Sequence, residues 1–64
     1  MDSEKFNMSM RKFLKQVGVT SQQQIEALAR DSDLGDATTL KVRMVLTAAN
    51  TDLEHVVEGE IDLG

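Results

Sequence analysis

The spacing of apolar side chains changes near Thr38, and this change limits the folds open to the chain. Before that point apolar residues recur at intervals of three and four, which is typical of one face of a helix. After it, apolar and polar residues alternate, which is typical of a half-buried strand. We therefore predict an α+β fold with two helices followed by an antiparallel β-hairpin, in the order ααββ.

The first helix is expected over about residues 3–17. Its apolar stripe consists of Phe6, Met10, Phe13, Leu14 and Val17. Asp2 or Ser3 can cap its start, because a short polar side chain accepts hydrogen bonds from the first free amides. Gly18 is the predicted stop, since glycine readily takes the left-handed conformation that ends many helices, with Val19 folding back onto Leu14.

The second helix is expected over about residues 21–32. Ser21 with Gln24 three residues later fits a capping box, and Thr20 is another possible cap. The short apolar face of this helix consists of Ile25, Leu28 and Ala29. The segment 33–36 then reads as a turn-forming linker with Gly35 at its centre.

The remaining chain predicts two strands, about 38–48 and 53–63, paired as a hairpin. The register that opposes Ala48 and Leu53 also opposes Arg43 to Glu58 and Lys41 to Glu60. A slip of one residue would turn carboxylates into the core, so only registers with an odd sum of paired numbers are compatible. Registers shifted by two stay open. The same pairing leaves an apolar pair, Val45 and Val56, on the outer face.

A chain of 64 residues makes one domain, here residues 1–64, with a thin stability margin. The expected core is Phe6, Met10, Phe13, Leu14, Val17, Ile25, Leu28, Leu40, Val42, Met44, Leu46, Val57 and Ile61. Cysteine is absent and there is one histidine, so disulfides, thiolate metal sites and a two-histidine metal site are excluded within one chain. Association with a second copy is the remaining way to add stability. We expect a homodimer that completes the fold, joined by pairing of open strand edges or by exchange of the hairpin about residues 33–36.

One histidine and one group of aspartates could suggest a reactive or metal-binding site, but neither fits one. His55 could act as a general base, but Glu54 and Glu58 point away from it in an alternating strand and no nucleophile is near. Asp31, Asp33 and Asp36 suggest calcium, but the loop fails the EF-hand pattern at three positions. We therefore predict no catalytic, cofactor-binding or metal-binding residues and no enzyme activity. An enzyme would need a composite site around two copies of His55.

The charge layout bears on partners. The net charge is −4: residues 1–32 carry five basic and four acidic side chains, and residues 33–64 carry two basic and seven acidic ones. A helix-turn-helix in the first half could place Gln22 and Gln23 on bases, with Arg11, Lys12 and Lys15 on phosphates. The negative charge, the polar second helix and the missing third helix disfavour nucleic acid. No apolar run is long enough for a membrane span, and an acidic N-terminus without an apolar segment disfavours a signal peptide. A cytoplasmic location follows as an expectation.

Two stretches resemble a family of very short bacterial proteins, mostly proteobacterial, catalogued as a domain of unknown function. They are N-M-S-M-R-K-F-L-K-Q-V-G-V-T-S-Q-Q-Q-I-E at 7–26 and H-V-V-E-G-E-I at 55–61. The resemblance implies a free-standing bacterial cytoplasmic protein and transfers no site residues. The leading hypothesis is a non-enzymatic protein–protein interaction module that self-associates. The alternative is a small nucleic-acid-binding regulator that uses the helix-turn-helix-like half.

Overall fold

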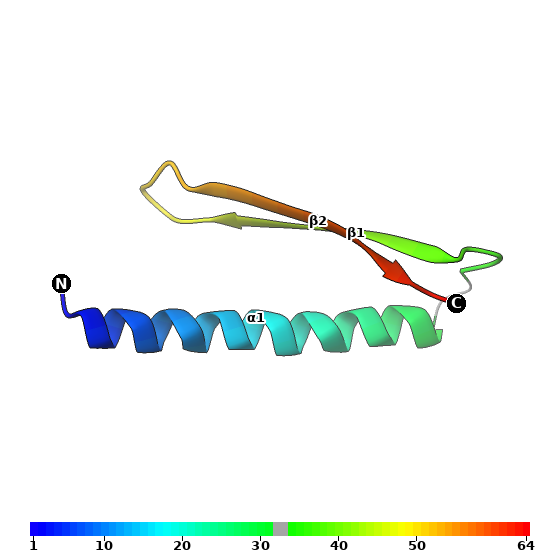
Figure 1. The fold of residues 1–64 in the computed structure, drawn as a ribbon, viewed down its shortest axis with the longest axis horizontal. Helices are drawn as coiled ribbons and strands as arrows, with labels where there is room; N and C mark the ends of the chain where they lie inside the picture. Colours follow the sequence, from blue (N-terminus) through cyan, green and yellow to red (C-terminus); the bar gives the residue numbers. More distant parts are fainter. Residues whose placement is uncertain (32–33) are drawn as a thin grey trace. The chain divides into compact units, whose positions relative to one another are not determined.

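The structure, a computed structural model, describes residues 1–31 and 34–64. The chain divides into two units, Met1–Leu34 and Gly35–Gly64, which are described here one at a time. The first contains one helix, α1 (Ser3–Asp31), and the second contains two strands, β1 (Thr39–Thr47) and β2 (Glu54–Asp62) (Figure 1). The α+β class is confirmed.

Helix α1 begins at a well-formed cap. One carboxylate oxygen of Asp2 accepts hydrogen bonds from the amides of Glu4 and Lys5, at 3.0 and 3.1 Å. The carbonyl of Asp2 accepts the first helical bond, from the amide of Phe6 at 2.9 Å. Because the first amides of a helix have no partner inside it, this side chain stabilises the start of α1. Of the two predicted caps, Asp2 performs the role.

The prediction of two helices is wrong: α1 runs without a break through 29 residues, from Ser3 to Asp31 (Figure 1). Gly18, the predicted stop, is helical; the glycines with positive φ are Gly35 and Gly64. The hydroxyl of Thr20 bonds back to the carbonyl of Gln16 at 2.8 Å, as side chains inside helices do. Ser21 likewise lies inside α1 and caps nothing.

The physical reason is that a weak helical segment differs from a helix end. Gly18 costs about 1 kcal/mol relative to alanine inside a helix, and its valine and threonine neighbours cost a few tenths each. Ending the helix there would leave up to four amides and four carbonyls without helical partners and would require a second costly nucleation. Helix-forming residues flank the segment and there is no proline, so continuation is cheaper.

Continuation also aligns the apolar side chains of both predicted helices. At about 100° per residue, all of them except Ala29 fall within roughly 120° of the circumference of α1. We call this band the helix stripe; it consists of Phe6, Met10, Phe13, Leu14, Val17, Ser21, Gln24, Ile25 and Leu28. Its two polar members, Ser21 and Gln24, interrupt the band without displacing it.

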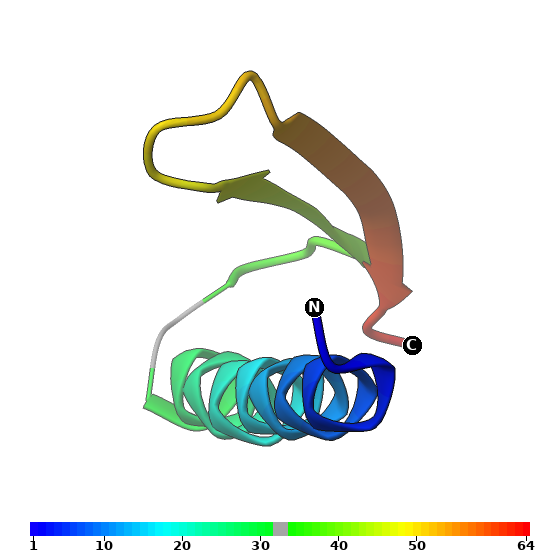
Figure 2. The same cartoon turned by 90° about the vertical axis from the view of Figure 1, so that its left-hand side faces the viewer.

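The hairpin has the predicted register. Arg43 faces Glu58, Lys41 faces Glu60 and Val45 faces Val56, so paired numbers sum to 101 throughout. The strands, Thr39–Thr47 and Glu54–Asp62, lie within the predicted ranges and are slightly shorter. The twist of the two strands about each other is visible in Figure 2. The predicted four-residue loop, bounded by Ala48 and Leu53, is therefore extended by one residue at each end.

Hydrogen bonds hold both ends of the hairpin. The amide of Leu63 donates to the carbonyl of Thr38 at 2.8 Å, one pair beyond the ladder. In the loop, the carbonyl of Ala48 accepts from the amide and the hydroxyl of Thr51, at 3.3 and 2.8 Å. Asn50 takes a left-handed conformation with φ of 62°, which asparagine tolerates better than most residues. These contacts fix the turn and hence the register.

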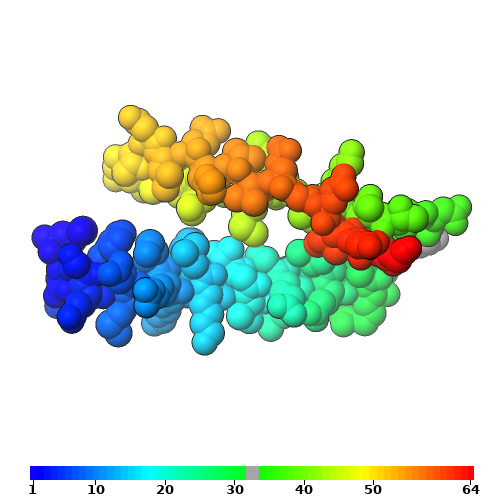
Figure 3. Space-filling view, viewed as in Figure 1, coloured from blue at the N-terminus to red at the C-terminus, as the bar shows by residue number. Residues whose placement is uncertain are grey.

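The predicted core is not closed within one chain. Among residues 1–31 and 34–64 no side chain is fully buried. Leu40, Val42, Leu46 and Ile61, on the inner face of the hairpin, are half-buried, whereas Met44 and Val57 on the same face are exposed. In the space-filling view the hairpin is a thin ribbon of side chains (Figure 3). A two-stranded sheet of this kind is marginal alone.

Candidate interaction surface

The helix stripe is the most apolar exposed surface of the first unit. Its large members Phe6, Met10, Phe13, Leu14 and Leu28 are each between 40% and 51% exposed. No charged side chain falls among the nine stripe positions. Val17 and Ile25 are half-buried. A mainly apolar band of this length without a charged member is unusual on a monomeric protein and is typical of surfaces that bind other surfaces.

Lys12 and Lys15 lie on the side of α1 away from the stripe, and Arg11 flanks the edge formed by Leu14 and Ile25. Arg11, Lys12 and Lys15 are all exposed, and at about 100° per residue they point away from Phe13 and Val17. The exposed side of α1 away from the stripe is therefore its basic side. The stripe can meet another apolar surface without bringing these charges into it.

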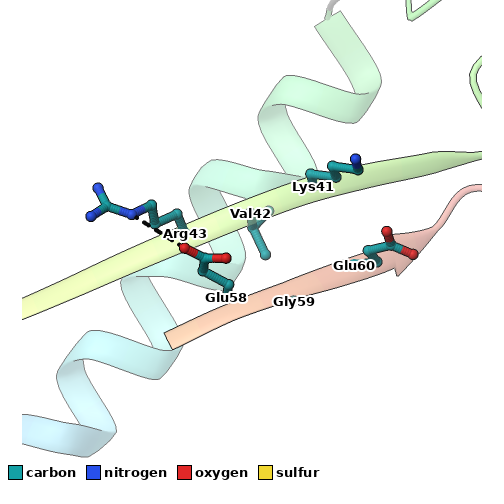
Figure 4. A pocket seen from close by; sticks show the side chains of 6 residues that line it. All are labelled: Lys41, Val42, Arg43, Glu58, Gly59 and Glu60. Atoms are coloured by element: carbon teal, nitrogen blue, oxygen red, sulfur yellow. Dashed lines mark ion pairs between the residues drawn. The ribbon is translucent and has the colours of Figure 1, made fainter. Parts of the chain in front are cut away.

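The outer face of the hairpin carries the cross-strand charges. Arg43 Nε lies 3.6 Å from Glu58 Oε1, and both side chains are largely exposed (Figure 4). Lys41 and Glu60 face each other in the register, but among the described residues Arg43–Glu58 is the only ion pair between the strands within 4.0 Å. An exposed pair of this kind adds little stability, about 0–1 kcal/mol.

A shallow hollow lies in the middle of the hairpin. Its lining is Lys41, Val42, Arg43, Glu58, Gly59 and Glu60 (Figure 4). A glycine inside a strand, such as Gly59, often marks a bulge or a close approach of another segment. The ladder continues unbroken across Gly59 opposite Val42, and a side chain there would meet nothing within 4 Å, so neither applies here. The hollow is wide and mixed in charge, with no set of converging groups.

The two free edges of the hairpin differ in charge. The amide of Leu63 donates to the carbonyl of Thr38, the residue directly opposite it, so this pair exchanges hydrogen bonds between the strands. In an antiparallel ladder such pairs alternate with pairs whose backbone groups point away from the partner strand. The residues with outward-pointing backbone groups are therefore those whose side chains lie on the outer face. On β1 these residues are Thr39, Lys41, Arg43, Val45 and Thr47. On β2 they are Glu54, Val56, Glu58, Glu60 and Asp62. The β2 edge is therefore acidic at four of five positions, and the β1 edge is basic at two.

His55 lies where the register predicted, opposite Leu46 near the loop end of the sheet. It is exposed, although the register places it on the inner face of the hairpin. A single exposed imidazole without an orienting partner has no arrangement that would make it a general base.

Of the three aspartates that suggested a calcium loop, the structure describes Asp31 and Asp36. Asp31 is paired with Arg30, whose Nε lies 3.1 Å from Asp31 Oδ1, and Asp36 is exposed in a turn with Gly35. Asp33 and the predicted helix end at Ser32 lie outside the described residues. Within the described ranges, no group of three or more metal-ligating side chains comes together.

The helix-turn-helix interpretation is wrong, because α1 contains no turn. Gln22 and Gln23 lie in the middle of a continuous helix, not at the start of a recognition helix. The side-chain amide of Gln22 donates to a carboxylate oxygen of Glu26 at 2.8 Å, one turn further along. The geometry that would present these amides to base edges is missing.

The sequence contained a signal for the continuous stripe that the local capping pattern concealed. Ile25 follows Val17 by eight residues and Leu28 follows it by eleven, which repeats the intervals from Phe6 to Leu14 and to Val17. Such intervals continue one helical face across Gly18. A test of phase between the two predicted helices would have predicted one.

Comparison with known proteins identifies the family and no more. Neither a curated protein nor a solved structure matches the chain. In the part of the chain that is described, no helical segment combines the length and the apolar character that crossing a bilayer requires. One family model matches residues 1–64, the full chain, and its description is "Family of unknown function (DUF6494)". The chain therefore belongs to this family of unknown function.

Proposed function

We propose that this protein is a non-enzymatic protein–protein interaction module that self-associates, at least as a homodimer. The observation that carries the proposal is the helix stripe, in which Phe6, Phe13 and Leu14 are half exposed. In addition, no side chain of the described residues is fully buried. Burial of apolar surface is the main driving force for folding and for association, and one chain leaves much of it unused. A second copy of the chain would supply the missing apolar surface.

The absence of catalysis is part of the proposal. Its support is the surroundings of His55, which is exposed and flanked along its strand by Glu54 and Val56, whose side chains face the other side of the sheet. The hollow between the strands has a salt bridge as its main polar feature. Enzyme sites are usually enclosed, with polar groups converging on one point.

The charges on the hairpin edges bear on the two expected routes to a dimer. Antiparallel pairing of two β2 edges about their midpoints opposes Glu58 to Glu58, and the same pairing of two β1 edges opposes Arg43 to Arg43; like charges in such positions destabilise a sheet. Pairing β1 with β2 of the next copy joins opposite charges but leaves a new open edge each time, so it does not close into a dimer. Edge pairing is therefore disfavoured. Hairpin exchange would pivot at residues 33–36, of which Asp33 lies outside the described residues.

Analytical ultracentrifugation of the full chain from 1 to 500 µM tests the proposal. We expect a concentration-dependent shift to at least twice the chain mass. Fluorescence titration with DNA and RNA at low salt runs alongside, and we expect no binding. A monomer throughout the concentration range would overturn the proposal.

A further inference from the structure

We infer that two copies associate through their helix stripes, with the two α1 helices antiparallel and Val17 at the centre of the contact. This inference rests on the proposed self-association and adds its geometry: the partner is a second α1, and its orientation is fixed. The evidence is the order of positions along the stripe, the sizes of the side chains at those positions and the distribution of charge along α1.

The main stripe positions are arranged symmetrically about Val17. They are residues 6, 10, 13, 17, 21, 24 and 28, with intervals of four, three, four, four, three and four. Read from either end, the order is the same. When two such helices run antiparallel with Val17 facing Val17, each of these seven positions meets another of the seven.

The same alignment matches large side chains with small or polar ones. Phe13 meets Ser21 of the second copy, and Met10 meets Gln24. Phe6 meets Leu28 at both ends of the contact. The two polar interruptions of the stripe are thereby covered by bulky apolar side chains, which fill space between helices as cores require.

A parallel pair would have a different contact. Ser21 would meet Ser21 and Gln24 would meet Gln24, which leaves a thin, polar half beyond Val17. The aromatic side chains would crowd at the other end, where Phe6 meets Phe6 and Phe13 meets Phe13. Unfilled space in one half and crowding in the other both lower stability.

The period of the stripe favours a straight contact. Phe6, Val17 and Leu28 are separated by eleven residues each, and Leu14 and Ile25 by the same interval. Eleven residues span close to three helical turns, so the stripe drifts by only about 20° per repeat around the helix. Two such helices stay in contact over about 33 Å, from Phe6 to Leu28, with little supercoiling.

Charge along α1 also favours the antiparallel pair. Residues 3–16 carry four basic and one acidic side chain, and residues 18–31 carry one basic and two acidic ones. An antiparallel pair sets each positive half beside a negative half, whereas a parallel pair sets like halves together. The helix dipoles add to the preference, because each positive end lies beside a negative end.

The area available predicts the strength of association. Phe6 and Phe13 are half exposed, so each has on the order of 100 Å² left to cover. A contact of one helix stripe per copy falls at or below the lower end of specific interfaces, about 1,200 Å² in total. We therefore expect a dissociation constant in the micromolar range.

Disulfide trapping tests the geometry, because the natural chain has no cysteine. Two full-length variants, Met10→Cys and Gln24→Cys, carry tags of different length, and they are mixed and mildly oxidised. We expect the mixed disulfide to exceed either homodimer at least tenfold and to decrease on dilution. Lys12→Cys, on the opposite side of α1, is the matched control and should cross-link at background level.

A second pair leaves the apolar side chains intact. Ser3→Cys and Asp31→Cys lie on the stripe side at the two ends of α1, and the same alignment brings them together. Circular dichroism confirms that each variant is helical. In each test two cysteine variants are mixed. If either mixture forms mainly disulfides between identical variants, the antiparallel orientation is overturned. If the chain sediments as a dimer but all disulfides stay at the Lys12→Cys level, the helix stripe is not the interface. A monomer at every concentration overturns the proposed function itself.

Discussion

The helix stripe and the edges of the hairpin are both uncovered, but only the edges are guarded by charge. Four of the five outward-facing residues of β2 are acidic, so two β2 edges repel each other. The stripe of α1 has no charged side chain between Phe6 and Leu28. Strand edges bind by backbone groups common to all proteins, so charges protect them from indiscriminate pairing. The difference favours the helix over the sheet edge as the surface for the proposed association.

The largest expected effect comes from placing a charge in the stripe. Phe13→Glu should weaken self-association by at least about 100-fold, because the dimer would contain two buried carboxylates without partners. Sedimentation equilibrium measures the change. Lys12→Glu adds the same carboxylate on the opposite side of α1 and should leave the dissociation constant within about threefold. Equal weakening by both substitutions would contradict the distinction between the stripe and the rest of the molecule.

Two glycines, one in each unit, should respond to alanine with opposite signs. Gly18 is helical and a side chain there meets nothing within 4 Å, so Gly18→Ala should raise the free energy of unfolding by about 1 kcal/mol. Gly35 has φ of 62°, so Gly35→Ala should lower it by about 1 kcal/mol. Urea denaturation at one fixed protein concentration measures both. Destabilisation by Gly18→Ala would indicate a helix end at that position.

Loss of the helix cap should have a similar or smaller effect. Asp2→Ala removes the acceptor for the amides of Glu4 and Lys5 and should lower the free energy of unfolding by about 0.5–2 kcal/mol. Asp2→Asn keeps an acceptor oxygen and should retain most of the stability. The comparison by thermal denaturation separates the hydrogen bonds from the negative charge. Equal loss in both variants would assign the effect to charge alone.

The smallest effect is expected at the exposed ion pair of the hairpin. A double-mutant cycle with Arg43→Ala and Glu58→Ala should give a coupling energy below about 1 kcal/mol, since both side chains are mostly exposed. The coupling should decrease further in 0.5 M salt. A coupling well above that limit would show that the outer face is covered in the folded assembly.

The hairpin was predictable from the sequence in a way that the helix was not. In a strand the side-chain period is two, so one misplaced residue turns Glu58 and Glu60 to the wrong face, and this penalty selects the register. At Gly18 the local residues cost a continuous helix only about 1–2 kcal/mol, and glycine, valine and threonine occur both inside helices and at their ends. Local signals such as Ser21 and Gln24 could not decide between a cap and a helix interior. The exposure of the stripe and of His55 depends on the total amount of surface that the folded chain buries. The spacing of side chains in the sequence does not predict this amount.

Because the described residues form no closed core, the fraction of folded protein is expected to depend on its concentration. When a chain completes its burial only by pairing, folding and assembly become one reaction of second order in chain concentration. A tenfold dilution then lowers the apparent stability by about 1.4 kcal/mol, with no change in sequence, temperature or solvent. The proposed pairing would then make abundance a regulator of stability: dilute chains would unfold more often, and concentrated chains would protect one another.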